Sequence, residues 1–231
     1  MKNEKSKVTI ENNLNKYRQK IEKIPENNIQ SVVPEIGVPI LEKLMYVSDE
    51  ILVELYTELL AKASDKEKCD STHPSFVNII NNLSPKEIRI LEFIYEKSLA
   101  IVSVNVITDD SSHPVEQISE LALEVDIYDE NTTAHISNLV GLGLIDMNFN
   151  IQFSNIQRYV RLEDRIKQIY SNAPIELQEV EMISHLMRGN VSFGRGTIKI
   201  SSFGGLFLKA CTENRRKTEL FNLFSSIDIQ S

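Results

Sequence analysis

The stretch SDEILVELYTELLAKAS, residues 48–64, predicts a long helix with one apolar face. Its apolar residues recur at intervals of three and four: Ile51, Leu52, Leu55, Leu59 and Leu60. Ser48 is the expected N-cap, and Asp49 and Glu50 follow in the first turn, where the helix dipole favours anions. Comparable periodicity on both sides predicts a mainly α-helical protein with a small β component.

Apolar residues at helical spacing also precede this helix. One stripe consists of Leu14, Tyr17, Ile21 and Ile24, and Pro25 ends it. This stripe suits a peripheral helix packed within the chain or, alternatively, a short seam in a homodimer. A second helix is expected over residues 36–46, and a third begins at Pro74, after a polar loop, and ends near Leu83.

The order of elements from Ser84 onward is typical of a winged helix. The sequence Ser84-Pro85-Lys86-Glu87 predicts a capping box, and alternating β-branched residues predict a strand over 101–108. Further elements are expected as helices over 115–124 and 131–142, a strand over 144–149, an insertion over 150–190, a strand pair or wing tip over 191–201 around Gly194-Arg195-Gly196, and a helix from Ser202. The expected regions are therefore 1–30 (polar helix or linker), 31–83 (helical), 84–216 (winged-helix-like) and 217–231 (tail).

Composition limits the classes of function. The chain has 231 residues and a formal net charge of -8, which excludes a protein that coats nucleic acid as a whole. Residues 1–149 hold 14 basic and 25 acidic side chains, whereas residues 150–231 hold 11 basic and 8 acidic. Any basic site is therefore expected in the last third.

Two cysteines cannot form a disulfide framework, and no apolar run approaches the roughly 20 residues that span a bilayer. The charged N-terminus has no apolar segment typical of a signal peptide. These features lead us to expect a soluble cytoplasmic protein that does not insert into a membrane.

The expected recognition helix, residues 131–142, contains neither Lys nor Arg. Because phosphate neutralisation supplies most of the affinity for duplex DNA, a role in packing or protein binding is favoured over groove reading by His135, Ser137 or Asn138. A nucleic-acid or anion contact would have to come from basic residues in the insertion and wing. These are Arg158, Arg161, Arg165, Arg188, Arg195 and Lys199.

No set of residues predicts catalysis or metal binding. Cys69 and His73 have a possible ligand spacing but need two further ligands, for which only Asp70 and Cys211 are candidates by type. Glu181 with His185, and Ser112 with His113, are isolated pairs better explained by helix and turn chemistry. We expect no cofactor, no metal and no enzymatic activity.

Specific strings resemble the abortive infection alpha family of bacteria. They are the helix Leu52–Ala63, the element His73-Pro74-Ser75-Phe76-Val77, the turn Leu83-Ser84-Pro85 with Leu91, the segment Asn138–Ile145, and the closing residues Ser202-Phe203-Gly204, Phe207 and Ala210-Cys211. The similarity spans roughly residues 30–215, and the pairing of the first two strings at close spacing is its most specific part.

The resemblance implies a component of phage defence by abortive infection. It implies no known reaction, so it assigns no catalytic residues to this chain. The preferred function is a non-enzymatic component that acts on an unknown protein partner. The alternative is a winged-helix regulator that binds nucleic acid weakly through its basic wing and insertion.

Overall fold

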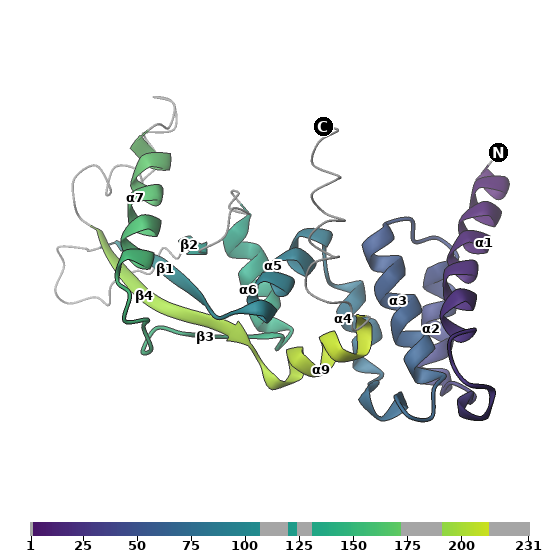
Figure 1. The fold of residues 1–231 in the computed structure, drawn as a ribbon. Helices are drawn as coiled ribbons and strands as arrows, with labels where there is room; N and C mark the ends of the chain where they lie inside the picture. Colours follow the sequence, from purple (N-terminus) through teal and green to yellow (C-terminus); the bar gives the residue numbers. More distant parts are fainter. Residues whose placement is uncertain (1, 107–119, 124–130, 172–190, 213–231) are drawn as a thin grey trace. The chain divides into compact units, whose positions relative to one another are not determined.

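The computed structural model describes residues 2–106, 120–123, 131–171 and 191–212, and the chain forms two compact units (Figure 1). We call Met1–Pro85 with Ser202–Ser231 the helical unit and Lys86–Ser201 the sheet unit. The protein is mostly helical with a small β component, as expected. The C-terminal helix groups with the N-terminal helices, which differs from the expected region 84–216.

The helical unit is built around one central helix. Its α-helices are α1 (Lys2–Ile21), α2 (Pro34–Leu44), α3 (Glu50–Ala63), α4 (Ser75–Asn81) and α9 (Ser202–Cys211), with short 3₁₀ turns at Glu26–Asn28 and Cys69–Ser71. Helix α3 contacts each of the other four. It therefore buries residues on nearly every side, including Thr57 and Glu58, which is typical of a helix enclosed by its neighbours.

The start of α3 corrects one expectation. Asp49, not Ser48, is the N-cap, and its Oδ1 accepts hydrogen bonds from the N–H groups of Ile51 and Leu52, both at 3.0 Å. A carboxylate satisfies these free donors and also interacts favourably with the positive end of the helix dipole. The helix consequently begins one residue later than the sequence pattern suggested.

The apolar stripe of α1 is used within the chain. Tyr17 forms a hydrogen bond of 2.9 Å with Ser64 Oγ at the end of α3, and Ile24 is buried. Asn13 donates to the carbonyls of Leu44 and Val47, both at 2.9 Å, and so satisfies the C-terminal end of α2. The stripe therefore packs against other helices of the same chain, as a peripheral helix requires.

The sheet unit contains a four-stranded antiparallel sheet in the order β2-β1-β4-β3. Its elements are α5 (Pro85–Glu96), β1 (Leu99–Val106), β2 (Glu120–Leu123), α6 (Thr132–Gly141), β3 (Ile145–Asn148), α7 (Gln157–Ser171) and β4 (Val191–Ile200). Helix α7 covers one face, where Tyr159, Leu162 and Ile166 pack against Ala100, Val102 and Val104. The alternate residues Leu99 and Ile101 are also fully buried, so β1 is enclosed on both faces.

The expected winged helix is not confirmed. Residues 120–123 form strand β2 and pair with β1, although a helix was expected over 115–124; residues 115–119 lie outside the described residues. The segment 191–200 is one continuous strand between β1 and β3, not a hairpin tip. A short apolar run is compatible with either a helix or a strand. Residues 120–123 form a strand because they pair with the edge of β1.

Two glycines, Gly194 and Gly196, lie inside strand β4, where the sequence pattern predicted a wing tip. A Cβ at Gly196 would lie 2.8 Å from both Asn148 O and Phe149 Cδ1, and a Cβ at Gly194 would overlap Ser103 Oγ. Glycine is needed here because other atoms lie directly over the strand, not because the chain turns.

A third glycine does end a helix, as its position suggested. Gly143, with φ of 71°, follows α6, and its N–H donates to Val140 O while Leu144 N donates to Leu139 O. This pair of bonds is a Schellman motif, in which glycine takes the left-handed position.

Candidate functional site in the helical unit

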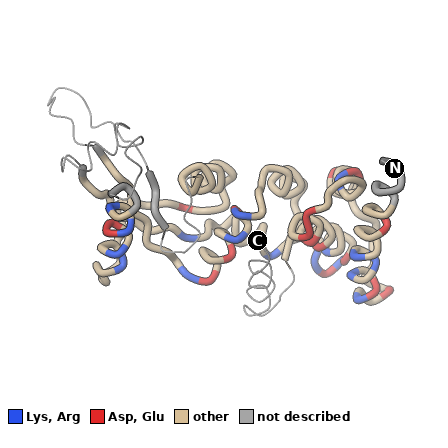
Figure 2. The backbone as a smooth tube through the Cα atoms, turned by 90° about the horizontal axis from the view of Figure 1, so that it is seen from above, with Lys and Arg blue, Asp and Glu red and all other residues tan. Residues whose placement is uncertain are grey.

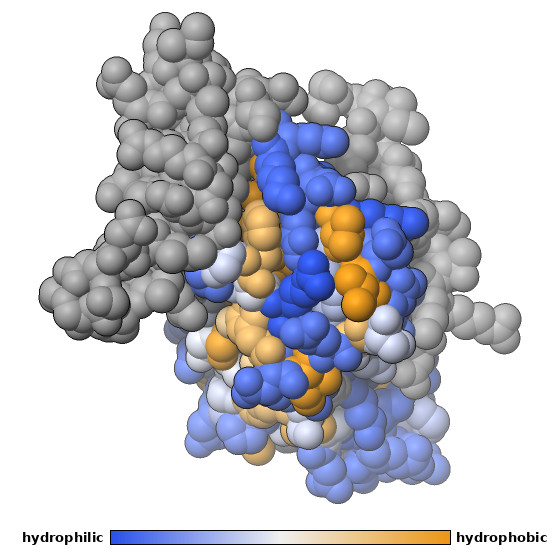
Figure 3. All heavy atoms as spheres, turned by 90° about the vertical axis from the view of Figure 1, so that its left-hand side faces the viewer, coloured by the Kyte–Doolittle hydropathy of each residue, from blue (hydrophilic) through white to orange (hydrophobic). Residues whose placement is uncertain are grey.

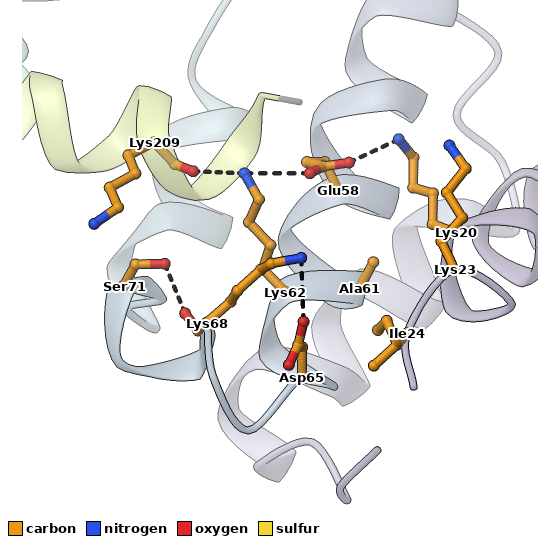
Figure 4. A pocket seen from close by; sticks show the side chains of 10 residues that line it. All are labelled: Lys20, Lys23, Ile24, Glu58, Ala61, Lys62, Asp65, Lys68, Ser71 and Lys209. Atoms are coloured by element: carbon orange, nitrogen blue, oxygen red, sulfur yellow. Dashed lines mark hydrogen bonds and ion pairs between the residues drawn. The ribbon is translucent and has the colours of Figure 1, made fainter. Parts of the chain in front are cut away.

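A pocket of ≈ 260 Å³ lies among α1, α3, the turn that follows α3, and α9 (Figure 4). Five of the residues that line it are lysines and two are carboxylates. The lining residues are Lys20, Lys23, Ile24, Glu58, Ala61, Lys62, Asp65, Lys68, Ser71 and Lys209. All of them belong to the helical unit, so the site is complete within one part of the structure.

A buried ion network forms the inner wall of this lysine pocket. Lys20 Nζ lies 2.7 Å from Glu54 Oε1 and 2.7 Å from Glu58 Oε2, and Lys62 Nζ lies 3.2 Å from Glu58 Oε1. Burial alone would lower the pKa of Lys20, but its hydrogen bonds with Glu54 and Glu58 and their negative charges raise the pKa above its ordinary value. Glu58 thus lies between two ammonium groups.

Lys62 also joins two helices. Its ammonium group donates to the carbonyls of Lys209 and Thr212, both at 2.6 Å, at the C-terminal end of α9. Helix C-termini carry free carbonyls and a partial negative charge, so a cation here is favourable. Lys62 therefore fixes the end of α9 onto α3 and cancels the negative potential of that helix end.

The second carboxylate of the pocket is also paired. Asp65 is buried, and its Oδ2 lies 3.2 Å from Lys68 Nζ, while its Oδ1 accepts from the N–H of Glu67. Lys23, Lys68 and Lys209 lie at the exposed rim. Five lysines line the pocket against Glu58, Asp65 and the adjoining Glu54, so the excess charge of the site is positive and favours an anion.

The predicted basic residues do not assemble into one open surface. Arg195 forms an ion pair with Glu163 of α7, and Arg158 stacks at 3.7 Å on the Phe153 ring and donates to Ser98 O. Arg161 and Arg165 lie on α7, where acidic and basic residues alternate (Figure 2). The side of the sheet unit that carries α7 is mainly hydrophilic with small apolar patches (Figure 3). Lys199 is exposed on β4, and Arg188 lies outside the described residues.

Two polar side chains of the expected recognition helix, α6, lie against helix α5. Asn138 of α6 donates to Glu87 Oε1 at 2.8 Å, and His135 Nδ1 lies 3.5 Å from the same oxygen. Glu87 is a buried residue of α5. Two of the three side chains considered for base contacts are therefore engaged with α5, within the sheet unit.

The residues weighed as metal ligands have other partners. His73 Nδ1 accepts from the N–H of Ser75 at 3.1 Å, which ties the polar loop to α4, and Cys69 Sγ lies 3.5 Å from Lys66 O. Within the described ranges, no group of three His, Cys, Asp or Glu side chains is placed to hold a metal ion. The pairs Ser112 with His113 and Glu181 with His185 lie outside these ranges.

The lysine pocket was missed because its residues come from three segments that are distant in the sequence: 20–24, 58–71 and residue 209. One signal was present: Glu54, Glu58 and Lys62 recur every four residues along an otherwise apolar helix, which places their charges on one buried face. This stripe has two carboxylates and one lysine, so a balanced ion network needs a second cation from another helix. Lys20 of α1 supplies it.

Comparison with known proteins decides the family. The model of the abortive infection alpha family matches residues 9–211. The chain belongs to the abortive infection alpha family. Membership associates it with abortive infection, and a search of curated proteins finds no match.

One solved structure is similar to this family member. It is the structure of an uncharacterized protein from the hydrocarbon-degrading marine bacterium Alcanivorax borkumensis SK2, with a TM-score of 0.38 and 15% sequence identity over 63% of this chain and 94% of that chain. Similarity at this level carries no functional argument. No helix among the described residues is long and apolar enough to cross a membrane.

Two of the strings that resemble the abortive infection alpha family meet around one ring, and a third lies beside the pocket. Phe76 of the HPSFV element lies 5.4 Å from Phe203 and 5.5 Å from Phe207 of the closing helix, measured between ring centroids, and 5.8 Å from His73. The LLAKA end of α3 contributes Ala61 and Lys62 to the neighbouring pocket. The α3–α9 contact that closes the pocket is therefore built from family-matched segments.

Proposed function

We propose that the protein is a non-enzymatic component of abortive infection that defends bacterial cells against phage by contacting another protein in the cytoplasm. The observation that carries this proposal is the outer face of α2. Val38, Leu41 and Met45 are exposed by 53%, 44% and 48%, and Tyr46, just after the helix, by 63%.

Helix α2 is apolar on two sides, although folding requires only one. Ile36, Ile40 and Leu44 form its buried side. The exposed residues are spaced by three and four, so they form a second stripe along the helix. Exposed large apolar residues gathered on one element are typical of a surface that a partner protein covers. The spacing suits a partner that lays an apolar helix across the stripe.

The alternative of a winged-helix nucleic-acid regulator is not carried forward. It required a basic wing, whereas Gly194-Arg195-Gly196 lies inside strand β4 and Arg195 is paired with Glu163. The helix that was considered for groove reading is also engaged within the sheet unit, since Asn138 donates to Glu87.

The test compares two double variants in a phage challenge of cells with and without the gene. Leu41→Asp/Met45→Asp places two charges on the α2 stripe, and Ile151→Asp/Ile156→Asp places two charges at residues of the sheet unit that are exposed by 57% and 54%. We expect the wild-type protein and the Ile151/Ile156 variant to protect cells, and the α2 variant to lose protection while keeping the same circular dichroism and melting temperature.

Protection that survives in the α2 variant would contradict the assigned surface. A wild-type gene that gives no protection against any phage tested would contradict the function itself.

A further inference from the structure

We propose that the lysine pocket of the helical unit is a binding site for a small anion that carries at least two negative charges, of the phosphate or diphosphate class. The proposal does not depend on the contact surface of α2. It rests on the charge of the pocket, on the pairing of its carboxylates, and on its size.

The two carboxylates in the pocket do not face a ligand as open negative charges. Glu58, whose side chain is 7% exposed, is flanked by Lys20 and Lys62, and Asp65, whose side chain is 4% exposed, is paired with Lys68. In Figure 4 the ammonium groups of these three lysines gather around the two acids. An anion that enters therefore meets a lining whose excess charge is positive.

The C-terminal end of α9 would normally repel an anion. Here the carbonyls of Lys209 and Thr212 accept hydrogen bonds from Lys62, so that end is covered by a cation. Lys62 thus reduces the repulsion that the carbonyls at the end of α9 would exert on a bound anion. Lys23, in the turn that follows α1, and Lys209 of α9 also line the pocket and add positive charge at its exposed rim.

Size and chemistry narrow the ligand class. A volume of ≈ 260 Å³ is just below the roughly 300–1,000 Å³ of pockets that enclose drug-sized ligands, so a compact molecule is expected. A lysine ammonium group is a compact point charge, and it can bind the tetrahedrally arranged oxygens of a phosphate from any direction. Ile24 and Ala61 supply an apolar surface beside the charges, against which a non-phosphate part can pack.

The experiment titrates the 231-residue chain with pyrophosphate, ADP and adenosine by isothermal calorimetry. Pyrophosphate tests whether a diphosphate binds by its charge alone. ADP carries the same diphosphate group with a nucleoside attached, and adenosine is that nucleoside without phosphate. The variant Lys23→Gln/Lys68→Gln/Lys209→Gln removes three rim charges and leaves Lys20 and Lys62 to hold the fold. Lys43→Gln, on α2 and outside the pocket, is the matched control.

We expect pyrophosphate or ADP to bind with an affinity that falls as salt rises, because the attraction is electrostatic. The triple variant should bind at least about tenfold more weakly, a change of about 1.4 kcal/mol, and Lys43→Gln should bind like the wild type. An unchanged melting temperature of the triple variant shows that the loss is local. Lys209→Glu, a single exposed reversal, should weaken binding in the same direction.

Three results would overturn the proposal. The first is no binding of either phosphate probe at about 1 mM. The second is equal affinity in the wild type and in the folded triple variant, which would place the anion elsewhere. The third is binding of adenosine as tight as that of ADP, which would make the pocket a site for an uncharged molecule.

Discussion

Arg195, in the middle of β4, forms a two-point ion pair with Glu163 of α7. Arg195 Nε lies 2.6 Å from Glu163 Oε1, and Nη2 lies 3.1 Å from Oε2. The planar guanidinium matches the carboxylate in a way that lysine could not. The hydrogen bond with Glu163 raises the pKa of Arg195 further above its ordinary value. This pair joins the helix to the sheet beside the Tyr159 ring, 5.9 Å from the Arg195 guanidinium.

The first prediction is that this pair stabilises the sheet unit. The Glu163 side chain is only 11% exposed, so Arg195→Met leaves a buried carboxylate without its cation. We expect a loss of about 1–3 kcal/mol in the free energy of unfolding, measured by urea denaturation. The double variant Arg195→Met/Glu163→Met should be more stable than the sum of the single losses predicts. Strict additivity of the two substitutions would show that the pair does not couple.

A second prediction concerns two glycines of the sheet unit. Gly196→Ala forces a methyl group against Asn148 O and Phe149, and should lower stability by about 1–3 kcal/mol. Gly141→Ala is the matched control, because a Cβ there meets nothing within 4 Å and the residue lies in helix α6. It should raise stability by about 0.4–1 kcal/mol. Thermal unfolding of both variants checks the opposite signs, and a stabilising Gly196→Ala would mean that Phe149 moves aside freely.

The third prediction tests the core of the helical unit. Leu59 is fully buried on α3, and Leu55, Phe76 and Ile80 of the same unit are also buried. Leu91 is buried as well and belongs to the sheet unit. Leu59→Ala should lower the free energy of unfolding by roughly 2–5 kcal/mol. An unchanged denaturation midpoint would show that α3 is not central.

The helices of the helical unit could be predicted because each has a periodic apolar face and a recognisable start. The stripe on residues 51–60 predicted buried residues of α3, and the stripe on α1 predicted a packed face but not its partner, which is α3. The cap was placed one residue early because Ser48 and Asp49 are both good cap residues, and only the geometry of the free N–H groups selects Asp49.

The sheet and the lysine pocket could not be predicted, for a physical reason. Strand pairing is a non-local choice, so Glu120–Leu123 with its mixed pattern follows the edge of β1 and not its own propensity. The pocket likewise depends on distances between residues 20, 62 and 209. Charge counts located the basic excess in the last third, yet Arg158 and Arg195 there serve internal contacts.

The fourth prediction uses the two cysteines as reporters. Cys69 is partly exposed, whereas Cys211 is fully buried on α9, and burial raises the pKa of its thiol well above the ordinary value. A buried neutral thiol reacts slowly, so Ellman's reagent should label Cys69 at once and Cys211 only on local opening.

Lys62→Met removes the cation that fixes the end of α9 and should therefore speed the labelling of Cys211 severalfold. Lys66→Met is the control, because Lys66 Nζ donates to Asn27 O at 2.8 Å and does not contact α9. Equal labelling rates in the two variants would show that Lys62 does not hold α9 in place.

The last prediction concerns nucleic acid. We expect little or no binding to random duplex DNA near about 150 mM salt, weaker than the roughly micromolar end of non-specific binders. Affinity for DNA requires several cations that can reach phosphates, and each lost contact lowers the slope of log affinity against log salt by roughly 0.9. Arg195 is committed to Glu163, and Arg158 to Phe153 and Ser98 O, so two of the five described residues of the expected set serve contacts within the sheet unit. A fluorescence anisotropy titration with wild type and Arg161→Glu/Lys199→Glu decides the matter. Sub-micromolar, salt-sensitive binding that disappears in this variant would contradict the protein-contact function and restore a nucleic-acid role for the sheet unit.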